Sequence, residues 1–244
     1  MFCTRKKNVR CFIVKCLGLF MCWFTLHQVI GQTADTSFSF HNGDLVFQDL
    51  DCGELCTAIE TVTSGCHGSN FSHVALVEID SNHRIQVIEA IGENVHRTPV
   101  EQFLQRSLDS NGRPKVVVGR LQTAYQKLIP YALQEARMFI GKPYDDVFDI
   151  ANDKYYCSEL IYFSFKQAQM HPPVYSPDAT SLFKLEPMTF KDPATGKTFP
   201  AWIDYFKTLR APIPEGKPGL NPGGISRCAC LDIFYPLGKP SQKK

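Results

Sequence analysis

The 244-residue sequence lacks any run of 18 or more consecutive apolar residues, so no segment is long enough for a membrane-spanning helix. It also lacks an excess of basic charge. Of its 26 Lys and Arg, five lie within residues 1–31, which leaves 21 against 24 Asp and Glu in the rest of the chain. This balance disfavours a nucleic-acid-binding protein, because such proteins carry a basic footprint. With 44% hydrophobic and 20% charged residues, the composition is that of a folded globular protein.

Residues 1–31 have the three parts of a secretory signal peptide. A basic region, Arg5 to Arg10, precedes an apolar stretch from Cys16 to Leu26, and small residues follow up to Gly31. The apolar stretch is short for a membrane anchor, so we expect cleavage near Gly31. The sequence therefore predicts a secreted protein of the periplasm or cell envelope, with no spanning segment in the mature chain.

After the signal segment, the few cysteines form two clusters, and one cysteine lies apart from both. Six of the ten cysteines remain: Cys52, Cys56, Cys66, Cys157, Cys228 and Cys230. An exported protein permits disulfides, and we expect at least one that involves the first three, with Cys228 or Cys230 as possible partners. Cys157 stands alone in the sequence and is the candidate free thiol. The spacing of the first three does not match a zinc site, so we expect no metal and no cofactor.

The chain after the signal reads as one domain, 32–210, followed by a tail rich in Pro and Gly, 211–244. The tail is predicted to be irregular and to pack on the domain. Apolar patterns and turn signals predict strands at 43–47, 74–79, 85–90 and 115–121. They predict helices at 57–63, 98–108, 130–140 and 153–170, the second with Thr98 as its N-cap and Pro99 at its first position.

Cys157 falls in the first turn of the helix predicted at 153–170. The residues that share its helical face are mostly apolar, so Cys157 is expected to point toward the body of the protein. The positive end of a helix favours the thiolate, which is the nucleophilic form of cysteine. A small buried core residue is the competing interpretation.

His73 begins the apolar strand that runs to Ile79, and it shares one strand face with Ala75 and Val77. The pattern of the next strand predicts a hairpin with Val77 opposite Ile85, Ala75 opposite Val87 and His73 opposite Glu89. His73 alone would be a satisfied core histidine. A carboxylate beside it is instead the base-plus-orienter arrangement of nucleophilic catalysis.

These residues together indicate a thiol hydrolase. His73 would deprotonate Cys157, Glu89 would orient the imidazole, and the thiolate would attack a carbonyl carbon. The Cys157 backbone N–H would stabilise the oxyanion, and water would then hydrolyse the thioester.

Five short motifs carry a family resemblance: Gly43-Asp44, Phe71–Val74, Val87–Ala90, Gly141–Asp145 and Tyr156–Leu160. Over about Phe40 to Met170, the chain resembles the YiiX/YebB type of circularly permuted, NlpC-like enzymes in the papain-like superfamily. The resemblance implies an α+β fold in which an antiparallel sheet packs against the helix that bears the catalytic cysteine. It also implies a catalytic triad carried by Cys157, His73 and Glu89. Tyr144 matches a position where a hydroxyl can bind substrate, although a core or rim aromatic would serve equally well there.

Three functions remain open from the sequence. The first is a secreted cysteine hydrolase, an amidase or endopeptidase, that cleaves cell-wall (peptidoglycan) peptide. The second is a hydrolase or acyltransferase that acts on lipid esters or acyl amides. The third is a non-catalytic ligand-binding module. A charged, polar cleft would favour the first function, and a deep apolar cleft would favour the second.

Overall fold

The computed structural model describes residues 38–172, 174 and 181–235, and the predicted signal segment lies outside them. Its centre is a six-stranded antiparallel sheet in the order β4-β3-β2-β1-β5-β8. The strands are β1 (Leu45–Gln48), β2 (His73–Ile79), β3 (Ile85–Ile91), β4 (Asn94–Pro99), β5 (Val116–Leu121) and β8 (Leu231–Phe234). A separate two-stranded ribbon pairs β6 (Glu186–Pro187) with β7 (Pro218–Gly219).

Six α-helices accompany the sheet in the described part of the chain. They are α1 (Glu54–Val62), α2 (Val100–Gln105), α3 (Ile129–Met138), α4 (Cys157–Ala168), α5 (Pro200–Leu209) and α6 (Pro222–Ser226). Two 3₁₀ segments, η1 (Cys66–Gly68) and η2 (Thr123–Leu128), complete the elements. None of the described helices is long and apolar enough to cross a membrane.

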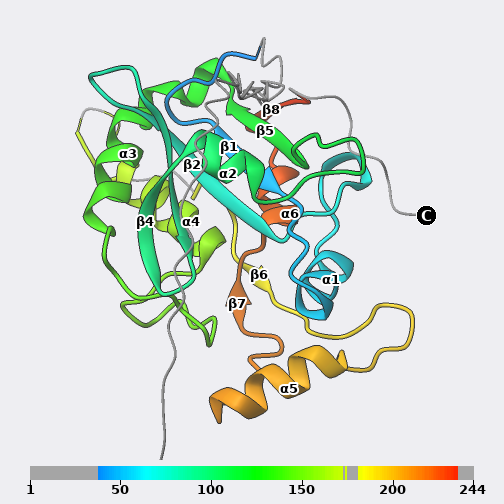
Figure 1. The fold of residues 1–244 in the computed structure, drawn as a ribbon. Coiled ribbons are helices and arrows are strands. Elements are labelled where there is room, and N and C mark those ends of the chain that lie inside the picture. The colour runs from blue at the N-terminus through cyan, green and yellow to red at the C-terminus, as the bar shows by residue number, and fades with distance from the viewer. Residues whose placement is uncertain (1–37, 173, 175–180, 236–244) are drawn as a thin grey trace, which may run out of the picture. The chain divides into compact units, whose positions relative to one another are not determined.

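Helices cover both faces of the sheet (Figure 1). Leu76 and Ile88 belong to the apolar cluster that includes the buried residues of α3 and α4. Val77 and Val87 belong to a second cluster that includes Phe103 of α2. Successive strand residues point to opposite faces. The strand face that holds His73 therefore packs against α2, whereas the cysteine-bearing helix packs against the other face.

Helix α5 lies away from the sheet (Figure 1), and a third apolar cluster is built around it. It joins Ala58 of α1 to Phe190, Trp202 and Phe206. Phe148 makes ring contacts with Phe190, Trp202 and Phe206 as well. This aromatic cluster was not predicted from the sequence, and it forms one side of the candidate site described below.

The predicted hairpin forms, but its predicted register is wrong by two residues. Val77 lies opposite Val87, and Ile79 lies opposite Ile85. The turn is tighter than expected because the Asp80 side chain accepts hydrogen bonds from the backbone N–H groups of Asn82 and Arg84. A shift of two residues leaves every side chain on its predicted face, since the side-chain period of a strand is two.

Three further expectations need correction. Thr98 and Pro99 are not the start of a helix, because β4 continues through Pro99 and α2 begins only at Val100. The segment after Ala211 is not irregular throughout, because β8 pairs with β5 along the edge of the main sheet. The helix expected from 153 begins at Cys157, which places the thiol at its first residue.

The six cysteines divide into two short-range disulfides and two thiols. Cys52 bonds to Cys56, and Cys228 bonds to Cys230. Cys66 and Cys157 are free and buried. The expected disulfide within the first group is therefore present, and Cys157 is a thiol as predicted.

Candidate active site

Cys157 is the first residue of α4 and therefore lies at the positive end of the helix dipole. The face of α4 predicted to be internal is buried, including Leu160, Ile161 and Phe165. These apolar contacts fix the helix against the sheet, and its first residue is thereby held beside the start of β2. The Cys157 side chain is 7% exposed, so the thiol is shielded but not sealed.

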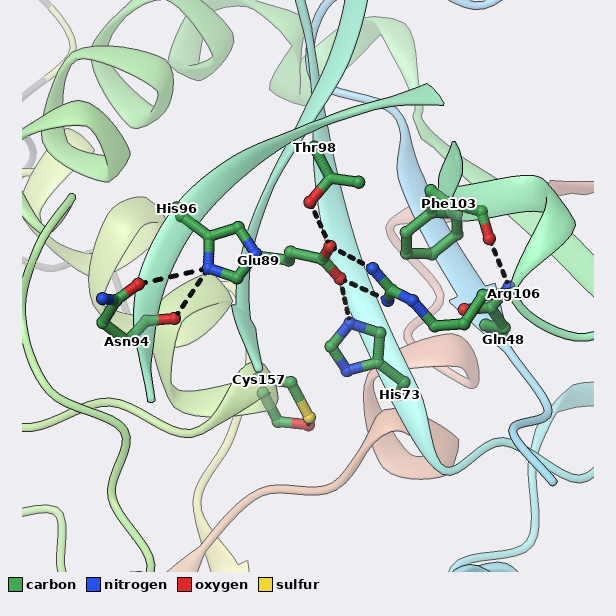
Figure 2. A network of polar contacts seen from close by, with 10 residues as sticks. Gln48, His73, Glu89, Asn94, His96, Thr98, Phe103, Arg106 and Cys157 are labelled. Atoms are coloured by element: carbon green, nitrogen blue, oxygen red, sulfur yellow. Dashed lines mark hydrogen bonds and ion pairs between the residues drawn. The ribbon is translucent and has the colours of Figure 1, made fainter. Parts of the chain in front are cut away.

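His73 and Glu89 lie in contact beside the thiol (Figure 2). The distance from His73 Nε2 to Glu89 Oε2 is 2.6 Å, and both side chains are buried. Glu89 lies diagonally across the two strands from His73 rather than opposite to it, because of the register described above. The long glutamate side chain spans this diagonal. With Nε2 bound to Glu89, Nδ1 is the ring nitrogen left for Cys157.

Two residues that the sequence analysis missed hold the Glu89 carboxylate (Figure 2). The Thr98 hydroxyl donates to Oε1 at 2.6 Å. Arg106 donates from Nη2 to Oε1 at 2.6 Å and from Nη1 to Oε2 at 2.8 Å. This fork-shaped pairing is the strong geometry for arginine and a carboxylate. A short strand around His96 extended by two residues would have placed Thr98 on the same face as His96. No local pattern connects Arg106 to Glu89.

The contacts of Glu89 keep it ionised although it is fully buried. Burial alone would raise the pKa of this carboxyl group, but hydrogen bonds from Arg106, His73 and Thr98 hold it well below its usual range. At neutral pH a buried carboxylate anion therefore lies next to the imidazole.

The pKa values of His73 and Cys157 move in opposite directions. Burial alone would lower the pKa of His73, but hydrogen bonds with Cys157 and Glu89 raise it to about 9. Burial alone would raise the pKa of Cys157, but the hydrogen bond and charge of His73 lower it, with help from Ser158 and the Val74 backbone. Both shifts favour a thiolate–imidazolium pair over the neutral pair.

A cavity of about 250 Å³ opens beside Cys157. Its wall is mixed. Nine of the twenty lining residues are apolar: Ile59, Val62, Phe148, Pro187, Met188, Phe190, Trp202, Leu220 and Pro222. Uncharged polar side chains also line it: Thr63, Ser72, Ser158, Thr189 and Asn221. Glu186 and Arg227 are its charged lining residues. The cavity is slightly smaller than the roughly 300–1,000 Å³ of pockets for drug-sized ligands, which suits a single side chain or a short acyl chain.

Tyr144, the predicted substrate-binding residue, lies in the wall of this cavity together with Cys157 and Ser158. Burial, and to a lesser degree the nearby charge of Cys157, raises the pKa of the Tyr144 phenol well above its usual value. The phenol is therefore neutral and can donate a hydrogen bond to a bound molecule.

Comparison with known proteins gives the family. Residues 39–229 match the sequence profile of the family described as "permuted papain-like amidase enzyme, YaeF/YiiX, C92 family". The chain is 29% identical over 126 residues to an uncharacterized protein, YiiX, of Escherichia coli strain K12. That match spans 52% of this chain and 57% of the relative, so the chain spans little more than half the length of the curated relative.

A solved structure shares the fold. The crystal structure titled "metalloprotein yiiX", from Escherichia coli O157:H7, superposes with a TM-score of 0.60 at 22% identity. The superposition covers 81% of this chain and 98% of that one. In the described part of the present chain, no three His, Cys, Asp or Glu side chains group so as to hold a metal ion. The α+β fold, with its antiparallel sheet against the cysteine-bearing helix, is confirmed, and the chain belongs to the YaeF/YiiX (C92) family of permuted papain-like amidases.

Proposed function

We propose that Cys157, His73 and Glu89 form the catalytic triad of this amidase. The observation that carries the proposal is their contact chain: a helix-terminal thiol beside a histidine whose other nitrogen binds a buried carboxylate at 2.6 Å. The thiol also lines the cavity, so a bound substrate can reach it.

The proposed reaction has two stages. The Cys157 thiolate attacks the amide carbonyl carbon, and the His73 imidazolium protonates the departing amine, which leaves a thioester. His73, now neutral, removes a proton from water as that water attacks the thioester, and the acid leaves with the thiolate restored. The Cys157 backbone N–H is positioned by the helix start to donate to the oxyanion, because the first N–H groups of a helix lack partners within the helix.

For the substrate, we propose an amide that carries an apolar group next to the scissile bond, as in a short acyl amide. The apolar part of the cavity wall, which includes Phe148, Phe190 and Trp202, supports this class, and Tyr144 would bind a polar atom near the scissile bond. A cell-wall peptide stays a candidate. Its charged groups would have Glu186 and Arg227 as partners in the cavity.

A substrate panel separates these candidates. We expect hexanoyl p-nitroanilide to be hydrolysed with a higher kcat/KM than acetyl p-nitroanilide, and cleavage to be lost in Cys157→Ala. A higher rate on γ-D-glutamyl-diamino-acid peptides than on either anilide would instead favour the cell-wall function. Mass spectrometry with an added amine acceptor distinguishes hydrolysis from acyl transfer. Ligand binding without turnover, unchanged in Cys157→Ala, would favour a non-catalytic module.

We also propose that the chain is exported and cleaved near Gly31, which rests on the pattern of residues 1–31 alone. N-terminal sequencing of the protein recovered from the cell envelope tests this. A mature N-terminus close to residue 32 supports export, and an intact N-terminus on cytoplasmic protein contradicts it.

A further inference from the structure

We propose that Arg106 is a positioning residue for the reactive pair, because it holds the Glu89 carboxylate in place and offsets its negative charge. The inference rests on the triad proposed above and extends it by one residue. Arg106 reaches both carboxylate oxygens, at 2.6 and 2.8 Å, while Glu89 Oε2 also binds His73 at 2.6 Å (Figure 2). The guanidinium and the imidazole therefore share the same anion.

Helix α2 places Arg106 there. Arg106 directly follows this short helix, and the buried Gln48 side chain donates from Nε2 to the Phe103 carbonyl at 2.8 Å. The Phe103 ring lies 6.0 Å from the His73 ring and 5.2 Å from the Arg106 guanidinium carbon. One helical turn thus contacts the histidine directly and the carboxylate through Arg106.

The charges of the group balance. His73 on β2 and Arg106 after α2 are the cations in contact with Glu89, and the Cys157 thiolate on α4 supplies a second anion beside His73. His96 on β4 lies opposite Glu89 and is the remaining titratable residue of the adjacent strand that faces it. With Arg106 present, Glu89 can orient His73 without fixing its proton too tightly for transfer to the leaving amine.

This arrangement predicts opposite effects of two substitutions that break the same contact. Arg106→Gln removes a cation near Glu89, so the carboxylate should stabilise the imidazolium more, and His73 should release its proton at higher pH. Glu89→Gln removes the anion, so His73 should release its proton at lower pH. A purely structural disruption would not produce shifts of opposite sign.

The experiment is an NMR titration of His73 in the full-length chain labelled with ¹⁵N-histidine, with the signal assigned by its loss in His73→Gln. We expect the midpoint to rise by about one pH unit in Arg106→Gln and to fall by a similar amount in Glu89→Gln. An unchanged or lowered midpoint in Arg106→Gln would overturn the proposal. No substrate is needed, so this test stands even if the wild-type protein hydrolyses none of the amides above.

The sheet offers a matched control. Glu78, on the same strand as His73, is a buried glutamate paired with Arg97 at 2.6 Å and with Arg137. We expect Arg97→Gln to lower the melting temperature but to leave the His73 midpoint unchanged. A shift in Arg97→Gln equal to that in Arg106→Gln would show that loss of any buried ion pair moves the titration, which contradicts a specific role for Arg106.

Arg106→Lys decides the matter if Arg106→Gln does not fold. This variant keeps the charge but loses the two-pronged contact. We expect the His73 midpoint to stay at its wild-type value, while kcat on the hexanoyl anilide falls about tenfold at unchanged KM. A wild-type kcat in Arg106→Lys would overturn the positioning role.

Discussion

Cys157 is the residue on which the proposed chemistry depends most directly. We expect Cys157→Ala to abolish amide hydrolysis, by at least about a thousandfold, because the remaining groups cannot form a thioester. The melting temperature should change little, because the substitution removes a single sulfur atom at the edge of a cavity. Circular dichroism and the anilide assay together test this.

Cys66→Ala is the matched control for that substitution, because Cys66 is the second buried thiol and lies outside the site. It should keep full activity. If Cys157→Ala unfolds while Cys66→Ala does not, Cys157 is chiefly a packing residue and the catalytic proposal fails.

The reactivity of the same thiol should depend on pH in a way that His73 controls. Because the His73 contact lowers the pKa of Cys157, iodoacetamide should label Cys157 well below the ordinary thiol pKa of about 8.5. Burial raises the pKa of Cys66, which therefore should stay unlabelled in the same sample. In His73→Ala, labelling of Cys157 should move to higher pH.

Peptide mapping of the alkylated protein across a pH series is the measurement. Equal labelling of the two cysteines at pH 6.5, or an unchanged Cys157 profile in His73→Ala, would show that the pair is not coupled. The measurement compares the extent of labelling of two cysteines in the same chain, so the intrinsic reactivity of the reagent affects both equally.

Among the elements, those with strong periodicity could be predicted from the sequence. The hairpin of β2 and β3 and the helix α4 follow apolar patterns that burial enforces, and the parity of the strands placed His73 and Glu89 on one face. The end of β4 could not be predicted, because Thr98 and Pro99 match a helix-start pattern although the strand continues through Pro99. β8 was missed because it lies in a segment where Pro and Gly suggested a loop.

The missed parts of the site have a common physical cause. Arg106 reaches Glu89 only because α2 folds back over the sheet, and the cavity wall combines α1, α5 and the ribbon of β6 and β7. Such contacts are set by tertiary packing, and a single sequence has no local signal for them.

Helix α6 offers a test of how closely the elements around the site are packed. A Cβ atom on Gly223 would come within 2.1 Å of the Thr63 carbonyl oxygen at the end of α1. Because this neighbour is backbone, we expect Gly223→Ala to lower the free energy of unfolding by about 1–3 kcal/mol. In Gly224→Ala the nearest atom is the Asn221 side chain at 3.2 Å, so the loss should be smaller. Urea unfolding of the two variants compares them, and equal stabilities would contradict the close contact between α6 and α1.

The stability of the whole molecule should fall in acid partly because of Glu89. The pKa of this carboxyl group is lower in the folded protein than its ordinary value of about 4.3. The ionised Glu89 carboxylate therefore contributes fully to stability at pH values above the ordinary pKa of about 4.3. This contribution is lost as the pH falls toward the pKa in the folded protein. The free energy of unfolding should decrease between pH 5 and pH 3.

Glu89→Gln should be less stable than the wild type at neutral pH, by about 3–5 kcal/mol, because Arg106 would lose its buried partner. It should also lose less stability on acidification, because it lacks the titrating group. Urea unfolding at a series of pH values gives the free energy of unfolding as a function of pH for both proteins. Parallel curves for the two proteins would show that Glu89 does not contribute to the acid sensitivity.

The cavity beside Cys157 is walled by stretches that lie far apart along the chain, 59–72, 144–158, 186–202 and 219–227. During synthesis on the ribosome, the thiol, the histidine and the carboxylate have all emerged once residue 157 is out, but the last wall arrives with α6, close to the end of the described chain. A nascent chain therefore carries its nucleophile before it carries the pocket that selects a substrate. For the amidase proposed here, the capacity to discriminate between amides would therefore be completed only near the end of synthesis.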